Sequence, residues 1–89
     1  MTREDYNGWT NYETWCVNLW LNNEYHSHEW LRALAMDEME DYDKAETLKV
    51  YVSEDCNPLI DDASMFTDLL NGALSEVNWY EIILAAKED

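Results

Sequence analysis

Glycine and proline are scarce in this chain of 89 residues, which contains only Gly8, Gly72 and Pro58. A β-sheet protein of this length needs many tight turns, and such turns commonly use these two residues. Long stretches without either residue favour helices, and so short a chain has room for one hydrophobic core. We therefore expect an all-α fold, a compact single domain of four or five short helices over residues 1–89. Residues 1–8 are expected to form a flexible or loosely packed N-terminal segment.

The first helix is expected within residues 7–24, NGWTNYETWCVNLWLNNE, which hold three of the five tryptophans. Thr10 and Glu13 have the spacing of a capping box at a helix start. The helix should end near residues 22–23. Its apolar side chains fall three and four residues apart, which predicts a stripe that packs into the core. These side chains are Tyr12, Trp15, Cys16, Leu19 and Trp20.

Residues 44–54, KAETLKVYVSE, are ambiguous between a helix and a strand. Leu48, Val50 and Val52 alternate as they would in a strand, whereas Ala45 and Leu48 have helical spacing. A lone strand would have no pairing partner in so small a chain. We therefore expect a helix here.

The remaining helix boundaries follow from residues that start or stop helices. A second helix is expected to begin at Ser27. After the only proline, Asp61 or Asp62 is expected to cap a further helix, which Gly72 helps to end. Asn78 has the spacing of a cap at the start of the last helix.

The net charge is extreme for a chain of this size. Asp and Glu number 20 against five Lys and Arg, which gives a formal net charge of −15 and a pI near 4.1. The sequence contains no basic stripe that could neutralise phosphates, so we expect no direct binding of DNA, RNA or anionic membrane. A basic surface on a partner protein is the natural complement of this charge.

No pattern in the chain points to catalysis, a metal or a cofactor. His26 and His28 stand two residues apart, a spacing that does not share a helix face, and no HExxH motif occurs. The acidic run DEMEDYD, residues 37–43, lacks the central glycine of an EF-hand loop. We expect a non-enzymatic protein without a cofactor.

The two cysteines and the lack of long apolar runs bear on the compartment. Cys16 and Cys56 do not form a CxxC pair, and Cys16 is expected to be a buried thiol, with a Cys16–Cys56 disulfide as the alternative. No run approaches the ~20 apolar residues that span a membrane. We expect a reduced, cytoplasmic protein with no membrane contact.

The acidic residues suggest a candidate binding face. Carboxylates three or four residues apart on a helix lie about 5–6 Å from one another, near the spacing of successive phosphates along a nucleic-acid strand. A charge of −15 corresponds to roughly 25 Å of duplex DNA. The charge either imitates nucleic acid or serves solvation, as in proteins of salt-loving organisms. The candidate residues are Asp37, Glu38, Glu40, Asp41, Asp43, Glu46, Asp61 and Asp62.

Two segments resemble a known family. The stretch GWTNYETWCVNLWLNNE is similar to the start of small phage, plasmid and archaeal proteins with the pattern GWxNYETWxVxLWxxN, and DLLNGALSEVNWYEI, residues 68–82, is similar to their closing segment. The family is largely of unknown function. The resemblance implies a helical domain carried by mobile genetic elements. Other small acidic phage proteins block host defence by imitating DNA, as antirestriction and anti-CRISPR inhibitors do, an analogy from setting and charge.

Two functional hypotheses follow. The first is a phage- or plasmid-encoded inhibitor of a CRISPR or restriction system, whose acidic residues occupy a basic DNA-binding surface in the host cytoplasm. The alternative is a non-enzymatic interaction or regulatory module, with a homodimer as one form. Its contacts would come from an aromatic patch, because Trp and Tyr are favoured anchors of interfaces. The patch would comprise Trp9, Tyr12, Trp20 and Trp30.

Overall fold

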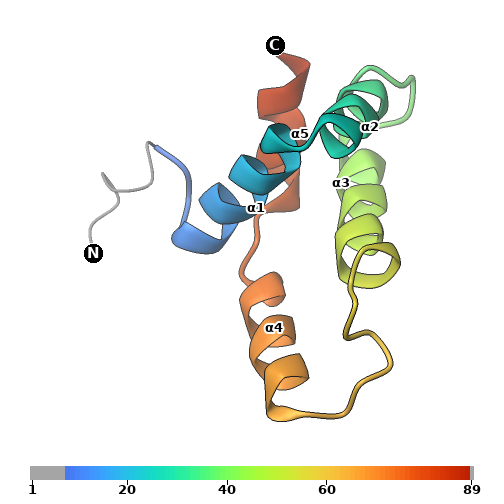
Figure 1. Cartoon of the computed structure of the whole chain (residues 1–89). Helices are drawn as coiled ribbons and strands as arrows, with labels where there is room; N and C mark the ends of the chain where they lie inside the picture. Colours follow the sequence, from blue (N-terminus) through green and yellow to red (C-terminus); the bar gives the residue numbers. More distant parts are fainter. Residues whose placement is uncertain (1–7, 89) are drawn as a thin grey trace.

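The computed structural model describes residues 8–88, and every regular element in that range is helical (Figure 1). In chain order the elements are α1 (Tyr12–Asn23), α2 (Tyr25–Ala35), α3 (Asp41–Val50), the π-helical turn η2 (Tyr51–Asp55), α4 (Met65–Ser75) and α5 (Trp79–Lys87). The expected all-α class is confirmed. The helix expected over residues 44–54 is also confirmed, since α3 and η2 together cover it. Apart from residue 8, the prediction for residues 1–8 lies outside the described residues.

The core lies where α5 packs against α1, α2 and α3. Its fully buried large side chains are Leu31 of α2, Leu48 of α3, and Ile82 and Ile83 of α5. Burying one such side chain stabilises a fold by about 1.5–3 kcal/mol, which makes these four residues the main source of stability. The last helix in the chain is therefore the central one in the structure.

Helix α1 turns a different face to the core from the one that its aromatic residues predict. Tyr12 is 45% exposed and Trp20 is 70% exposed. Thr14 and Leu21 are buried instead, and Val17 packs against the core. These three residues also fall three and four apart, so α1 carries two stripes with helical spacing. The prediction that the aromatic stripe builds the core is wrong, because the smaller side chains of the second stripe face α2 and α5.

The start of α1 explains why that second stripe is buried. The cap is Asn11, whose Oδ1 accepts a hydrogen bond from the Thr14 backbone N at 2.9 Å, so the capping box expected at residues 10–13 is wrong. The Thr14 hydroxyl donates to the same Oδ1 at 2.6 Å and accepts from the Asn78 backbone N at 2.8 Å. The Asn11 side chain also donates to the Glu76 carbonyl at 2.7 Å. These bonds tie α1 to the segment that leads into α5.

Replacing Thr14 with valine, which has the same shape, should lower the free energy of unfolding by about 1–3 kcal/mol, because the part-buried Asn78 backbone N loses its acceptor. Urea unfolding followed by circular dichroism measures the change. Thr47→Val is the matched control, because the Thr47 hydroxyl bonds only the Asp43 carbonyl of its own helix. Equal unfolding midpoints for the two variants would contradict the role given to Thr14.

Helix α2 begins two residues earlier than expected. It starts at Tyr25 rather than Ser27, and the Glu24 carboxylate caps it by accepting from the His26 backbone N at 3.1 Å. Ser27 is buried in the first turn, where its hydroxyl donates to the Leu21 carbonyl at 2.7 Å. Ser27 therefore satisfies a carbonyl near the end of α1 instead of capping the start of α2.

Of the caps predicted for the two C-terminal helices, one is wrong and one is confirmed. Ser64 caps α4, rather than Asp61 or Asp62, although the Ser64 hydroxyl donates to the Asp62 carboxylate at 2.7 Å. The prediction that Gly72 ends this helix is wrong, since α4 continues to Ser75. Asn78 caps α5 as expected, with its side chain accepting from the Glu81 backbone N.

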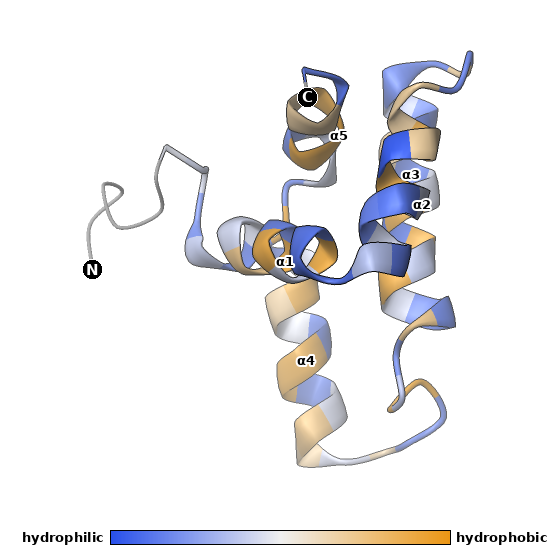
Figure 2. Cartoon of the chain, turned by 45° about the horizontal axis from the view of Figure 1, so that its top comes forward, coloured by the Kyte–Doolittle hydropathy of each residue, from blue (hydrophilic) through white to orange (hydrophobic). Residues whose placement is uncertain are grey.

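The two long connections lie at opposite ends of α3. Residues 36–40 join α2 to α3, whereas residues 56–64 join η2 to α4, which extends away from the other helices (Figure 1 and Figure 2).

Cys16 is half-buried and Cys56 is exposed, and both are free thiols. No helix within residues 8–88 combines the length and apolar composition needed to cross a bilayer.

Candidate functional site

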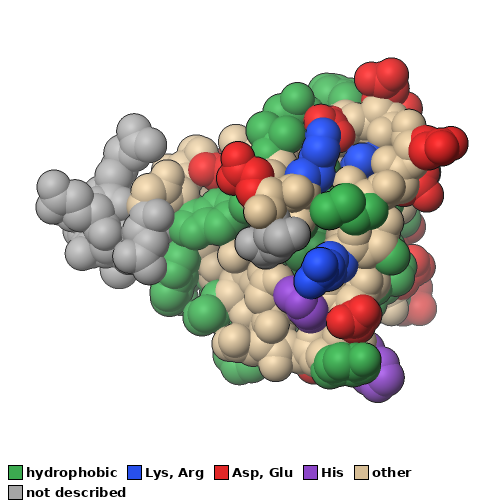
Figure 3. Space-filling model, turned by 90° about the horizontal axis from the view of Figure 1, so that it is seen from above, with side chains coloured by type: hydrophobic (Ala, Val, Ile, Leu, Met, Phe, Trp, Pro, Cys, Tyr) green, Lys and Arg blue, Asp and Glu red, His purple; other side chains and the backbone are tan. Residues whose placement is uncertain are grey.

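Acidic side chains gather around the connection between α2 and α3. Seen from the end of the molecule that carries this loop, carboxylates line one edge of the surface (Figure 3). Acidic residues are concentrated in the loop, residues 36–40, and in the first two turns of α3. We call this surface the acidic face and define it as Asp37, Glu38, Glu40, Asp41, Asp43 and Glu46.

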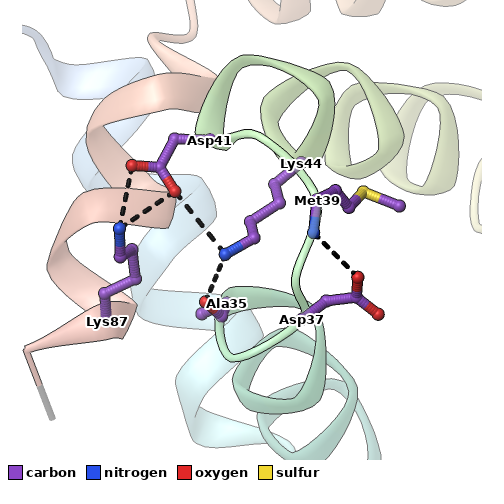
Figure 4. A network of polar contacts seen from close by, with 6 residues as sticks. All are labelled: Ala35, Asp37, Met39, Asp41, Lys44 and Lys87. Carbon is purple, nitrogen blue, oxygen red and sulfur yellow. Dashed lines mark hydrogen bonds and ion pairs between the residues drawn. The ribbon is translucent and has the colours of Figure 1, made fainter.

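The loop is held by its own side chains and by a buried lysine (Figure 4). Asp37 Oδ1 accepts a hydrogen bond from the Met39 backbone N at 3.0 Å, a local turn typical of aspartate. Lys44 of α3 is only 3% exposed, and its Nζ donates to the Ala35 carbonyl at 2.7 Å. The carbonyls at the end of a helix lack partners within the helix, so Lys44 satisfies one that would otherwise be buried and unbonded.

Asp41 connects the start of α3 to the end of α5. Its two carboxylate oxygens accept from Lys87 Nζ at 3.0 and 2.9 Å, and Lys44 Nζ lies 3.5 Å from one of them. The hydrogen bond from Lys87 lowers the pKa of Asp41 below its ordinary 3.8, and the same bond raises the pKa of Lys87 above 10.5. The pair is lost as the pH falls through the lowered pKa of Asp41 or rises through the raised pKa of Lys87. It is therefore intact throughout the neutral range.

Among residues 8–88, no Lys, Arg or His forms an ion pair with the other carboxylates of the acidic face. Both ion pairs found within residues 8–88 involve Asp41. Within residues 8–88, the carboxylate groups of Glu38, Glu40, Asp43 and Glu46 take part in no hydrogen bond and no ion pair. The two lysines nearest to the face are used inside the fold, so these four charges stand unneutralised at the surface.

Apolar side chains interrupt the carboxylates. Met36 is 57% exposed, Met39 40% and Tyr42 71%. Together with Tyr80 and Lys87 of α5 they border an open recess of about 880 Å³. Methionine adapts its shape to different partners, and tyrosine is enriched among residues that dominate binding energy.

The loop and the first two turns of α3 carry six of the eight predicted residues, and four of these, Asp37, Glu38, Glu40 and Asp41, border the same recess. Asp61 and Asp62 lie in the loop between η2 and α4, beyond the far end of α3. Asp62 accepts from the Ser64 hydroxyl and, through its carbonyl, from the Thr67 hydroxyl at 2.6 Å, so it supports the start of α4. Asp61 and Asp62 are therefore separated from the acidic face by the length of α3.

The predicted aromatic patch is divided. Trp9 is half-buried against the core, and Trp30 is half-buried with its ring stacked on Tyr51 at a centroid distance of 3.7 Å. Tyr12 and Trp20 are exposed on the outward side of α1. The four rings therefore do not form one exposed surface.

Three contact candidates escaped the sequence analysis although a signal for them was present. Met36, Met39 and Tyr42 stand at every third position through the acidic run, so apolar side chains recur among the carboxylates. The roles of Lys44 and Lys87 depend on how α2, α3 and α5 pack. No local pattern signals them.

The histidines and carboxylates do not gather into a metal site. No group of three or more His, Cys, Asp or Glu within residues 8–88 is placed to hold a metal ion. His28 Nδ1 lies 2.9 Å from Asn22 Oδ1, which gives that histidine a contact between the first two helices.

The fold and the face together define a small, strongly acidic, all-helical protein whose most distinctive surface is a set of unneutralised carboxylates. The chain belongs to a family of unknown function (DUF7249), whose model matches residues 2–88. No curated protein and no solved structure matches it.

Proposed function

We propose that this protein is a non-enzymatic inhibitor whose acidic face occupies the basic nucleic-acid-binding surface of a partner protein. The carboxylates take the place of phosphates, and the partner can no longer bind nucleic acid. The mechanism is competition for a surface, with association that is fast at low salt and weakens as salt screens the charges.

One observation carries this proposal: four carboxylates of the face have no partner among residues 8–88, while Lys44 and Lys87 are engaged within the fold. A free carboxylate at the surface is available to an arginine or lysine of a partner without breaking any bond of the inhibitor. Charge-assisted hydrogen bonds of this kind are the stronger class. The exposed Met36, Met39 and Tyr42 supply apolar contacts that strengthen a protein complex and that naked DNA would not offer.

The class of partner follows from the sequence resemblance to proteins of mobile genetic elements. A phage or plasmid gains from blocking host systems that recognise DNA, and these systems hold DNA in basic channels. A restriction or CRISPR complex in the host cytoplasm is therefore the proposed target.

Affinity capture from host extract tests the function. The tagged chain is incubated with extract at low and at high salt, and captured proteins are eluted with a short DNA duplex. We expect a nucleic-acid-binding protein that is retained only at low salt and released by the duplex. A partner that DNA does not displace would contradict the proposal.

Halophilic solvation is the competing explanation of the charge, and salt dependence of folding separates the two. We expect the chain to remain helical and to unfold cooperatively in about 20 mM salt, where screening is weak. Circular dichroism during thermal unfolding measures this. A chain that folds only in molar salt would favour halophily and count against the inhibitor.

A further inference from the structure

Helix α4 differs from the other four α-helices of residues 8–88 in having no buried residue, although six of its eleven residues are apolar. Met65 is 65% exposed, Phe66 64% and Leu69 64%. These three positions share one side of the helix, while Leu74 on the other side packs against the core. The helix thus presents one apolar side to its own protein and another to the outside.

The exposed side belongs to a well-formed helix. Ser64 caps its start by accepting from the Thr67 backbone N, and the Thr67 hydroxyl bonds the Asp62 carbonyl. Gly72 lies on the same outward side, and no atom stands within 4 Å of the place where a side chain would begin. The fold itself gives no reason for a glycine there, whereas a second helix packed on this side could approach closely.

The charge of the chain indicates which molecule covers the outward side of α4. Asp68 is the only charged residue of α4, in a chain whose net charge is −15. Two copies of so acidic a protein repel one another wherever their carboxylates meet, so they can associate only through an uncharged surface. Helix α4 provides that surface, and it lies at the end of the molecule opposite to the acidic loop (Figure 1).

We infer that a second copy of this chain covers the outward side of α4, forming a two-fold symmetric homodimer in which the two α4 helices pack on each other. A two-fold interface uses the same patch twice, as a self-complementary apolar helix face requires. This inference does not depend on the proposed function.

The exposed apolar area of α4 is close to what a small dimer interface buries. At roughly 200 Å² for a side chain of this size, Met65, Phe66 and Leu69 expose about 400 Å² per copy, or close to 800 Å² for two. Gly72 and Ala73 are exposed as well and extend the same side of the helix. The total then approaches the ~1,000 Å² that a specific interface buries.

Light scattering across a dilution series from about 1 mM to 1 μM tests the dimer. At high concentration we expect twice the chain mass of 10.6 kDa, falling toward 10.6 kDa on dilution. The variant Phe66→Ser/Leu69→Ser should weaken self-association by about thirtyfold or more, because it truncates two large apolar side chains at the proposed interface. Circular dichroism of each sample reports whether the helices persist.

Leu19→Ser/Trp20→Ser is the matched control, because it removes two exposed apolar side chains from α1 and should leave the dimer unchanged. Leu69→Gln keeps a good helix former and should also weaken the dimer, which separates loss of contact from melting of α4. A wild-type chain of 10.6 kDa at every concentration would overturn the inference. A dimer that survives the α4 variants, or that the α1 variant disrupts, would overturn it equally.

Discussion

Reversing Glu38, Glu40 and Asp43 to lysine should abolish binding to the basic partner while leaving the fold intact. Each of the three side chains is exposed and none is hydrogen-bonded within the described residues, so the substitutions break no internal contact. Each also places a cation where the partner presents cations, and like charges brought together in an interface cost several kcal/mol. We expect Kd to rise at least about a hundredfold, as measured by titration calorimetry against the captured partner.

A control with the same change of net charge shows whether position matters. Glu29→Lys/Glu54→Lys/Asp61→Lys also reverses three exposed carboxylates, but these lie on α2, on η2 and in the loop before α4. It should bind within about threefold of the wild type at physiological salt, because distant charges are screened. The control includes Asp61, which the sequence suggested and the structure separates from the acidic face. Equal loss of binding in the two triple variants would mean that net charge alone attracts the partner.

Replacing Lys44 with alanine should lower the free energy of unfolding by about 2–4 kcal/mol. The substitution removes the donor to the Ala35 carbonyl and also the buried stem that packs between α2 and α3. For a domain of this size the midpoint of thermal unfolding should fall by roughly 10–25 °C. Differential scanning calorimetry measures both quantities.

Two further lysine variants separate the amine from its stem. Lys44→Met keeps most of the apolar stem and should lose about 1–3 kcal/mol, the cost of an unbonded carbonyl. Lys49→Met changes an exposed lysine of the same helix and should shift stability by less than about 0.5 kcal/mol. If Lys44→Met were as harmless as Lys49→Met, the bond to Ala35 would not stabilise the α2–α3 connection.

The helical class and several helix positions could be predicted because their causes are local. Scarce glycine and proline predict helices. Asn78 marks the start of α5 because its side chain accepts a hydrogen bond from the backbone N of Glu81, three residues later. The orientation of α1 could not be predicted in this way. Two stripes of its residues have helical spacing, and the choice of Thr14 over Trp20 depends on contacts with a segment more than sixty residues away.

The acidic face was predictable in part for the same reason. Residues 37–46 are close in sequence, so their proximity follows from one loop and the start of one helix. Asp61 and Asp62 were assigned to the same face by charge alone, but they lie beyond η2, in the loop at the other end of α3. The use of Lys44 and Lys87 within the fold depends on three helices packing together, and it decides which carboxylates are free.

Fluorescence anisotropy of a labelled DNA duplex bound to the captured partner tests the central claim most directly. Adding the wild-type chain should lower the anisotropy to that of free duplex, whereas the Glu38, Glu40 and Asp43 reversal variant should leave it unchanged at the same concentration. If the wild-type chain bound the partner and the anisotropy stayed at its bound value, the acidic face would not occupy the nucleic-acid-binding surface.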